Sequence, residues 1–140
     1  MFFLSIRNSC RSQMAESILR SFDNKLEIFS AGIDPVDHVS QIAMEVMAEV
    51  RIDLKQSVPK HYSEFKGQKF DYLITVGEST HEELDIPDIQ YVRKLHLGVH
   101  SPYKNARSQE EIRMNCREVR DELMAELDYF YTRIIKKSVC

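Results

Sequence analysis

Short apolar runs alternate along the chain with longer segments whose apolar residues recur every three or four positions. Four runs predict β-strands, at residues 2–4, 26–29, 70–76 and 91–97. The third run is almost continuously apolar, which is typical of a strand covered on both faces of its sheet. One amphipathic segment follows Ser12 and has apolar residues at Met14, Ile18 and Phe22. A second begins after residue 41 and has them at Ile42, Val46 and Val50. Both predict helices.

The C-terminal segment carries the most regular helical pattern. Ser108 followed by Glu111 predicts a capping box at its start. We expect Glu118, Arg120 and Glu122 to face solvent. The apolar positions fall on one face over about six turns, and they are Ile112, Cys116, Val119, Leu123, Leu127, Phe130 and Ile134. Cys116 is therefore expected to be a small buried residue.

This order of elements predicts one α/β domain over residues 1–140, with a short helix between the third and fourth strands. We expect a doubly wound, four-stranded parallel sheet with helices on both faces. Ligands of such sheets bind beyond the carboxyl ends of the strands. Two loops occupy that place, residues 5–12 after the first strand and residues 98–108 after the fourth.

Composition and charge exclude several function classes. The chain has 19 Lys and Arg against 22 Asp and Glu, a formal charge of −3, so we expect no nucleic-acid partner. The apolar N-terminal run is interrupted by Arg7 and Arg11, so we predict neither membrane association nor export. A cytoplasmic location is the expectation that follows.

Cysteine and histidine positions give no sign of a metal site. Cys10, Cys116 and Cys140 are widely spaced, which favours reduced thiols over a disulfide framework. His96 and His100 have no third ligand nearby, and exposed loop histidines are the favoured interpretation. We expect neither a metal nor another cofactor.

The loop after the first strand has the residues of an oxyanion site. A tight turn from a strand into a helix directs backbone N–H groups and the positive end of the helix dipole at one place. The guanidinium of Arg11 has the planar shape to bind two oxygens of one oxyanion. The candidate anion-binding residues are Ser5, Ile6, Arg7, Asn8, Ser9, Cys10, Arg11 and Ser12.

Residues 8–16, Asn-Ser-Cys-Arg-Ser-Gln-Met-Ala-Glu, resemble the signature of the low-molecular-weight tyrosine phosphatase fold in its thiol-dependent arsenate reductase branch. The loop of that family reads Cys-x5-Arg-Ser. The resemblance continues at residues 30–32, after the expected second strand, and at 70–76, 96–98, 110–112 and 119–123. It implies a flavodoxin-like strand order, 2-1-3-4, and a ligand that is phosphate, arsenate or a phosphorylated side chain.

The resemblance places the catalytic positions on Ser5 (nucleophile), Arg11, Ser12 and Ser101 (acid), and two of them lack the family's chemistry. A cysteine at the nucleophile position attacks as a thiolate because the loop and the arginine lower its pKa. The hydroxyl of Ser5 stays protonated, and we expect Ser12 to face it as a second neutral hydroxyl. Ser101 cannot donate a proton near neutral pH.

Other departures leave alternatives open. Gly77 and Ile86 occupy the approximate places of the two relay cysteines of arsenate reductases, so that relay cannot operate within this chain. Cys10 is favoured as a packing residue beneath the loop over a substitute nucleophile. Arg7 points either into the cradle or into solvent, and His100 is favoured as a plain loop histidine over an alternative acid.

Three functions remain open. The chain is a catalytically disabled oxyanion-binding or regulatory protein, or a working phosphatase or reductase whose nucleophile was engineered to Ser5, or a protein–protein interaction module without a ligand in the loop. Joint loss of the nucleophile, the acid and both relay cysteines favours the first over the second. Retention of Asn8, Ser9, Arg11 and Ser12 favours the first over the third.

Overall fold

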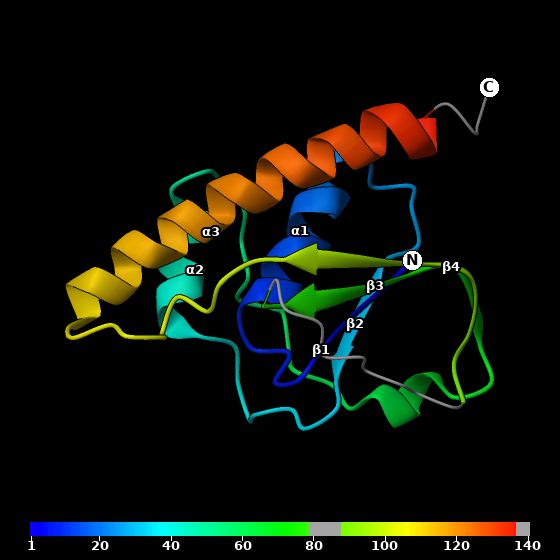
Figure 1. Cartoon of the computed structure of the whole chain (residues 1–140), viewed down its shortest axis with the longest axis horizontal. Coiled ribbons are helices and arrows are strands. Elements are labelled where there is room, and N and C mark those ends of the chain that lie inside the picture. Colours follow the sequence, from blue (N-terminus) through cyan, green and yellow to red (C-terminus); the bar gives the residue numbers. More distant parts are fainter. Residues whose placement is uncertain (79–87, 137–140) are drawn as a thin grey trace.

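The computed structural model describes residues 1–78 and 88–136. Four parallel strands form one sheet, crossed on one side by the long C-terminal helix (Figure 1). The strands are β1 (Phe2–Ser5), β2 (Phe29–Gly32), β3 (Lys69–Gly77) and β4 (Gln90–Gly98). Their order is β2-β1-β3-β4, which confirms the predicted 2-1-3-4 sheet.

Helices cover both faces of the sheet, but unequally. The helical elements are α1 (Arg11–Phe22), α2 (Gln41–Ala48), the 3-10 helix η1 (Tyr62–Phe65), α3 (Gln109–Phe130) and the π-helical turn η2 (Tyr131–Ile135). The three α-helices share one side, and η1 lies on the other (Figure 1). The short helix expected between the third and fourth strands falls outside the described residues.

Strand β1 is buried on both faces and divides the core in two. Phe3 points toward the helices and packs with the core of α1 and α3. Phe2 and Leu4 point the other way and pack with Phe65 of η1, whose ring centroid lies 5.0 Å from that of Phe2. The carboxyl end of β1 is thereby fixed from both sides, and the candidate loop begins there.

The second strand lies three residues later than predicted. Leu26 packs against the helical core from a loop, and the strand consists of Phe29 followed by the small residues Ser30, Ala31 and Gly32. Pairing with β1 sets this register, with Gly32 opposite Ser5. The pattern placed these small residues after the strand because the apolar run ends at Phe29.

Helix α3 follows its predicted apolar stripe until the last turn. There Ile135 is buried in place of Ile134, because the wider π turn rotates the helix face by one position. The hydroxyl of Ser108 accepts from the N–H of Glu111 at 3.1 Å, as predicted. The carboxylate of Glu111 accepts from the N–H of Arg107 instead of returning to Ser108, so only half of the capping box forms.

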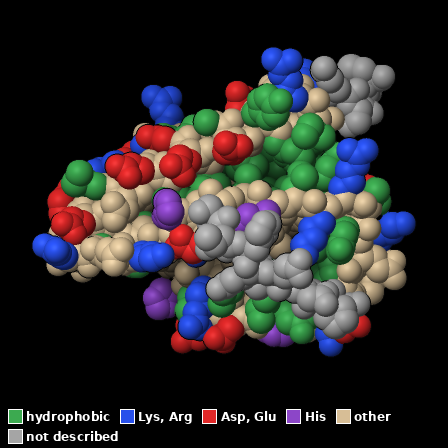
Figure 2. Space-filling view, viewed as in Figure 1, with side chains coloured by type: hydrophobic (Ala, Val, Ile, Leu, Met, Phe, Trp, Pro, Cys, Tyr) green, Lys and Arg blue, Asp and Glu red, His purple; other side chains and the backbone are tan. Residues whose placement is uncertain are grey.

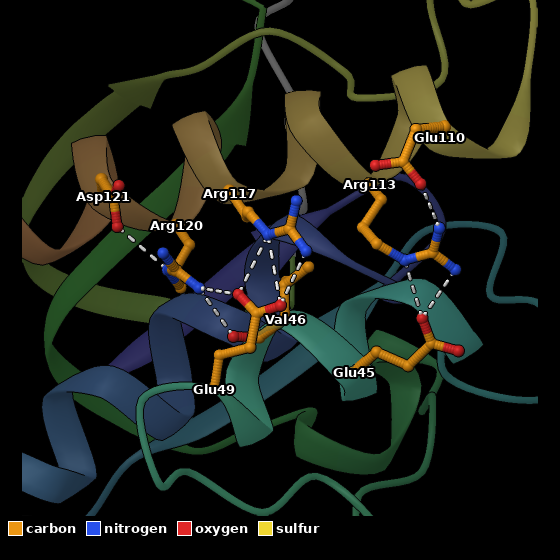
Figure 3. A network of polar contacts seen from close by, with 8 residues as sticks. All are labelled: Glu45, Val46, Glu49, Glu110, Arg113, Arg117, Arg120 and Asp121. Atoms are coloured by element: carbon orange, nitrogen blue, oxygen red, sulfur yellow. Dashed lines mark hydrogen bonds and ion pairs between the residues drawn. The ribbon is translucent and has the colours of Figure 1, made fainter.

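The prediction that Arg120 faces solvent is wrong. Its side chain is buried between α2 and α3, where Nη1 donates to Val46 O at 2.9 Å and to Glu49 Oε1 at 2.8 Å. Its Nε donates to Asp121 Oδ1, and Figure 3 shows this arginine within a network that joins the two helices. Glu118 and Glu122, which were expected to face solvent, are exposed. Figure 2 shows a row of acidic side chains along α3.

His96 is exposed as expected, but it lies in β4, within the strand predicted at residues 91–97, and is not a loop histidine. Its Nδ1 is 2.7 Å from Thr75 Oγ1, and its Nε2 is 2.9 Å from the carbonyl oxygen of Glu78. Within residues 1–78 and 88–136, no group of three or more His, Cys, Asp or Glu is placed to hold a metal ion. No helix in these ranges has the length and apolarity needed to cross a membrane. Ile86 and Cys140 lie outside them.

Candidate functional site

The structure brings the two predicted loops to one cavity at the carboxyl edge of the sheet. The cavity has a volume of about 300 Å³. Every residue from Ser5 to Arg11 lines it, and the second loop contributes Ser101, Pro102 and Tyr103. Ser12 is not part of this lining, but its Oγ lies 2.7 Å from Oγ of Ser5, which is.

The carbonyl groups of the first loop all point into the surrounding protein. Each accepts a hydrogen bond: Ile33 N to Ser5 O (3.1 Å), Asp34 N to Ile6 O (2.8 Å), Val36 N to Arg7 O (3.2 Å), Gln13 Nε2 to Asn8 O (3.1 Å) and Ser40 N to Ser9 O (2.9 Å). None of the described peptide bonds is cis. In a trans peptide the next N–H points opposite to the carbonyl, so the N–H groups of residues 6–10 point to the cavity side.

Most of these N–H groups are free of protein acceptors. The N–H of Asn8 donates to Ser5 Oγ at 3.1 Å. Within the described part of the chain, the N–H groups of Ile6, Arg7, Ser9 and Cys10 donate to no protein atom. A cavity edged by free amides at the start of α1 is an electropositive pocket of the kind that accommodates an anion.

Gly32 allows the loop to sit this close to β2. A Cβ atom at this position would lie 2.7 Å from the carbonyl oxygen of Ile6 and 3.1 Å from Cβ of Asn8. Real Cβ atoms do not approach a backbone oxygen so closely, so any larger residue would push the loop outward. The glycine at the end of β2 is therefore part of the site's construction.

Asn8 is the centre of a buried network that holds the loop in shape. Its backbone is left-handed, with φ of 52°, a conformation that asparagine tolerates better than most residues. Its Nδ2 donates to Ser12 Oγ at 2.9 Å and to Ser30 Oγ at 3.1 Å. Its Oδ1 accepts from Gln13 Nε2 at 3.0 Å and from the N–H of Lys60 at 2.9 Å. One side chain thus ties the loop to α1, β2 and the segment before η1.

The nucleophile position holds a serine among neutral partners. Ser5 Oγ lies 2.7 Å from Ser12 Oγ, as the sequence led us to expect, and its other partner is the N–H of Asn8. Neither partner is a base that could remove its proton.

The two loop arginines have different surroundings. Arg11, the first residue of α1, is partly buried and donates from Nη1 to Val99 O at 2.9 Å, which joins the two loops. Arg7 turns outward, and its Nη1 lies 2.5 Å from Asp34 Oδ2. Both side chains of that pair are largely exposed, at 59% and 71%. Of the two orientations left open for Arg7, the structure therefore shows the outward one.

No Asp, Glu or His of the second loop is among the residues that line the cavity. At the acid position, the N–H of Ser101 donates to Glu78 Oε1 at 3.1 Å. This hydrogen bond lowers the pKa of Glu78, and a weaker lowering comes from His100, whose Nδ1 is 3.1 Å from Oε2. His100 lines a separate cavity of about 350 Å³ beside α3 and is absent from the lining of the anion cavity.

Cys10 packs beneath the loop, the role favoured from the sequence. Its side chain is 5% exposed, and its Sγ lies 3.7 Å from Met14 Sδ and 4.0 Å from Cys116 Sγ. The hydrogen bond with Cys116 and burial raise the pKa of the Cys10 thiol well above its usual range. A thiol held in its neutral form is a poor nucleophile.

Sequence reasoning missed three features that position the site. Glu78 lies far from both loops in the chain, and no motif marks it as the anchor of Ser101. Gln13 was quoted only as part of the family-like stretch, although its amide supports Asn8. Ser40 was not singled out; its hydroxyl bonds to the phenol of Tyr103 at the cavity edge.

Comparison with known proteins gives one family. Residues 1–139 match the family model described as low molecular weight phosphotyrosine protein phosphatase. An arsenate reductase of Halalkalibacterium halodurans is 30% identical over 132 residues, covering 93% of both chains.

Solved structures with 21% identity or less share the fold. An arsenate reductase in the phosphate-binding state superposes with a TM-score of 0.73 at 21% identity, covering 95% of this chain and 96% of that one. Vibrio vulnificus Wzb in complex with benzylphosphonate gives a TM-score of 0.63 at 18% identity, covering 91% and 95%.

Proposed function

Because the chain belongs to the low molecular weight phosphotyrosine protein phosphatase family, whose members here include arsenate reductases, we propose that it binds a tetrahedral oxyanion and does not turn it over. The ligand is phosphate, arsenate or a phosphorylated side chain. The protein would then act as a binding or regulatory module. If the ligand is a phosphorylated side chain, the partner is the protein that carries it. The cytoplasmic location expected from the sequence stays a prediction.

The orientation of the loop peptides carries the proposal. Five consecutive carbonyls are bonded into the protein, which leaves the following N–H groups on the cavity side. These bonds come from residues 33, 34, 36, 13 and 40 and involve no catalytic side chain. The donors are therefore in place before any ligand arrives, which lowers the ordering cost of binding.

Positive charge at the same place comes from Arg11 and from α1. The guanidinium has five N–H donors, and its Nη1 donates to Val99 O. Its remaining donors can reach an oxyanion in the adjoining cavity, and a charged donor makes a stronger hydrogen bond than a neutral one. The N-terminus of α1, which begins at Arg11, adds the helix dipole.

Binding and catalysis separate in this site because they need different residues. Catalysis in the resembling enzymes needs a thiolate where Ser5 stands and an acid where Ser101 stands. Proton transfer alone contributes about 10² to 10⁴ in rate, and covalent catalysis adds to it. Binding needs only the amides, the helix and Arg11, all of which are present.

Calorimetric titration of phosphate tests the binding half, and two loop arginines supply a matched pair of variants. Arg11→Ala should weaken binding by about tenfold or more, since it removes a charged donor from the cavity. Arg7→Ala should leave the affinity within about twofold, because that side chain is exposed and paired with Asp34. Equal losses in the two variants, or no binding by the unmodified protein, would show that the loop is not an anion site.

Hydrolysis of p-nitrophenyl phosphate between pH 5 and 7 tests the catalytic half. We expect no turnover by the protein as sequenced and none by Ser5→Cys alone, since Ser101 leaves the acid missing. Ser5→Cys with Ser101→Asp is expected to regain measurable hydrolysis. Strong activity in Ser5→Cys alone would instead favour a working enzyme whose nucleophile had been replaced.

A further inference from the structure

Two buried thiols meet directly behind the anion loop. Cys10 is the residue of that loop directly before α1, and Cys116 lies on α3, 106 positions away in the chain. Their Sγ atoms are 4.0 Å apart, and Cys116 is fully buried. Neither thiol has a role in the proposed binding of an oxyanion, and packing alone does not require sulfur at both positions.

We propose that Cys10 and Cys116 form a reversible disulfide under sustained oxidation by a small peroxide, and that this bond weakens anion binding by the adjoining loop. The second half of the proposal rests on the proposed function. The first half does not, because it concerns only the two thiols.

Access for the oxidant comes through the anion cavity. Cys10 is one of the residues that line it, and the cavity volume of about 300 Å³ admits a molecule the size of hydrogen peroxide. Cys116 is sealed inside the core, so the first reaction falls on Cys10. Because that thiol is neutral and 5% exposed, the reaction is slow, and brief exposure leaves the pair reduced.

The chemistry balances with peroxide as the oxidant. The sulfur of Cys10 attacks one peroxide oxygen, the O–O bond breaks, and a sulfenic acid and one water result. The sulfur of Cys116 then attacks the sulfenic sulfur, the S–O bond breaks, and the departing hydroxide takes the thiol proton as a second water. Two thiols and one peroxide thus give one disulfide and two waters, and a dithiol reductant reverses the change.

Bond formation displaces at least one of the two cysteines, because their sulfurs lie 4.0 Å apart in the reduced protein. They have to approach from 4.0 Å to about 2.0 Å. Cys116 lies in the middle of α3 and is fully buried, whereas Cys10 lies at the junction of the loop and α1. Most of the movement therefore falls on Cys10 and on Arg11 next to it, the residues that present donors to the cavity.

Peptide mapping of the full chain after peroxide treatment and blocking of the remaining thiols tests the bond itself. We expect one cross-linked peptide pair that joins Cys10 to Cys116 and disappears on reduction. Cys140→Ser should give the same pair, and Cys116→Ala should give none. A link to Cys140, or oxidation of Cys10 to a sulfinic acid without a link, would overturn the proposal, and the map of the unmodified chain decides this even if a variant fails to fold.

Calorimetric titration with inorganic phosphate tests the consequence. Oxidation should lower the phosphate affinity by about tenfold, and reduction should restore it. Cys116→Ala should bind phosphate as the reduced protein does and should keep that affinity after peroxide treatment. Unchanged affinity in the cross-linked protein would refute the coupling, whereas a reduced protein that never binds phosphate would refute the proposed function and leave the mapped disulfide standing.

Discussion

Replacing Asn8 with alanine should destabilise the protein more than any other single change in the loop. The substitution places alanine in a left-handed backbone conformation, with φ of 52°. Alanine has no side-chain hydrogen bond to offset this conformation, which costs about 1 kcal/mol. It also removes the acceptor of the Lys60 N–H at 2.9 Å, and an unpaired donor costs about 1–3 kcal/mol. Gln13 Nε2 keeps two other acceptors, so the expected loss is about 3 kcal/mol in the free energy of unfolding.

Asn105 provides the matched control for the backbone part of this loss. It is also left-handed, with φ of 61°, but it is exposed, and its side chain makes no hydrogen bond within the described residues. Asn105→Ala should therefore cost only about 1 kcal/mol. Asn8→Gly separates the same two contributions at the site, because glycine adopts positive φ without strain and still lacks the amide.

Urea unfolding followed by circular dichroism measures these differences without any ligand. The expected order of stability loss is Asn8→Ala first, then Asn8→Gly, then Asn105→Ala. If Asn8→Ala costs no more than Asn105→Ala, the buried amide network does not hold the loop, and the argument from fixed carbonyls loses its support.

Three further predictions concern the network between α2 and α3 and the construction of the loop. Arg120→Met should lower the free energy of unfolding in urea by about 2 kcal/mol, because it leaves the buried carbonyl of Val46 unpaired. Arg117→Met removes a more exposed ion pair and should lower it by under about 1 kcal/mol. Similar losses in the two variants would argue against a special role for the buried arginine. Hydrogen bonds from Arg117, the larger cause, and from Arg120 lower the pKa of Glu49 from 4.5 to about 2. The stabilising contribution of its carboxylate is therefore complete above pH 4.5 and is lost as the pH falls toward 2. Glu49→Gln should flatten the stability profile across that window, and an unchanged slope in unfolding midpoints would contradict the assignment. Gly32→Ala should lower the phosphate affinity measured by calorimetry by about tenfold or more, because the new Cβ displaces the loop. Gly77→Ala should leave this affinity unchanged, since a Cβ there meets nothing within 4 Å. Equal effects would show that the close approach of the loop to Gly32 is unimportant for binding.

The sheet and the helices could be predicted because apolar periodicity reports burial directly. The continuous run ending at Val76 indicated a strand covered on both sides, and the stripe that includes Cys116 located α3 almost to its last turn. The prediction failed where charge was taken to mean exposure. Arg120 lies four positions after Cys116 and three before Leu123, at the edge of the apolar stripe on α3, and Val46 and Glu49 supply the partners that its buried guanidinium needs.

The candidate site was predictable in its residues but not in its orientation. Residues 5–12 were identified from their place between a strand and a helix, and Ser5 and Ser12 were expected to face each other. The outward turn of Arg7 toward Asp34 depends on a segment that follows β2, and the fixing of Ser101 by Glu78 depends on the end of β3. Both contacts join residues more than 20 positions apart, which no local pattern encodes.

Under the proposed function, the residues that hold the loop in shape are different from those that catalysis would need. The bonds that orient the loop run from its carbonyls to neighbouring segments and from the amide of Asn8 to three elements. The hydroxyl of Ser5 contributes only its contacts with Ser12 and with one N–H. A serine in place of a cysteine at that position would therefore leave the directions of the loop donors unchanged, in keeping with the proposed binding without turnover. A substitution at Asn8 or Gly32 would instead disturb anion binding, because the loop N–H groups would lose their directions whether residue 5 carried oxygen or sulfur.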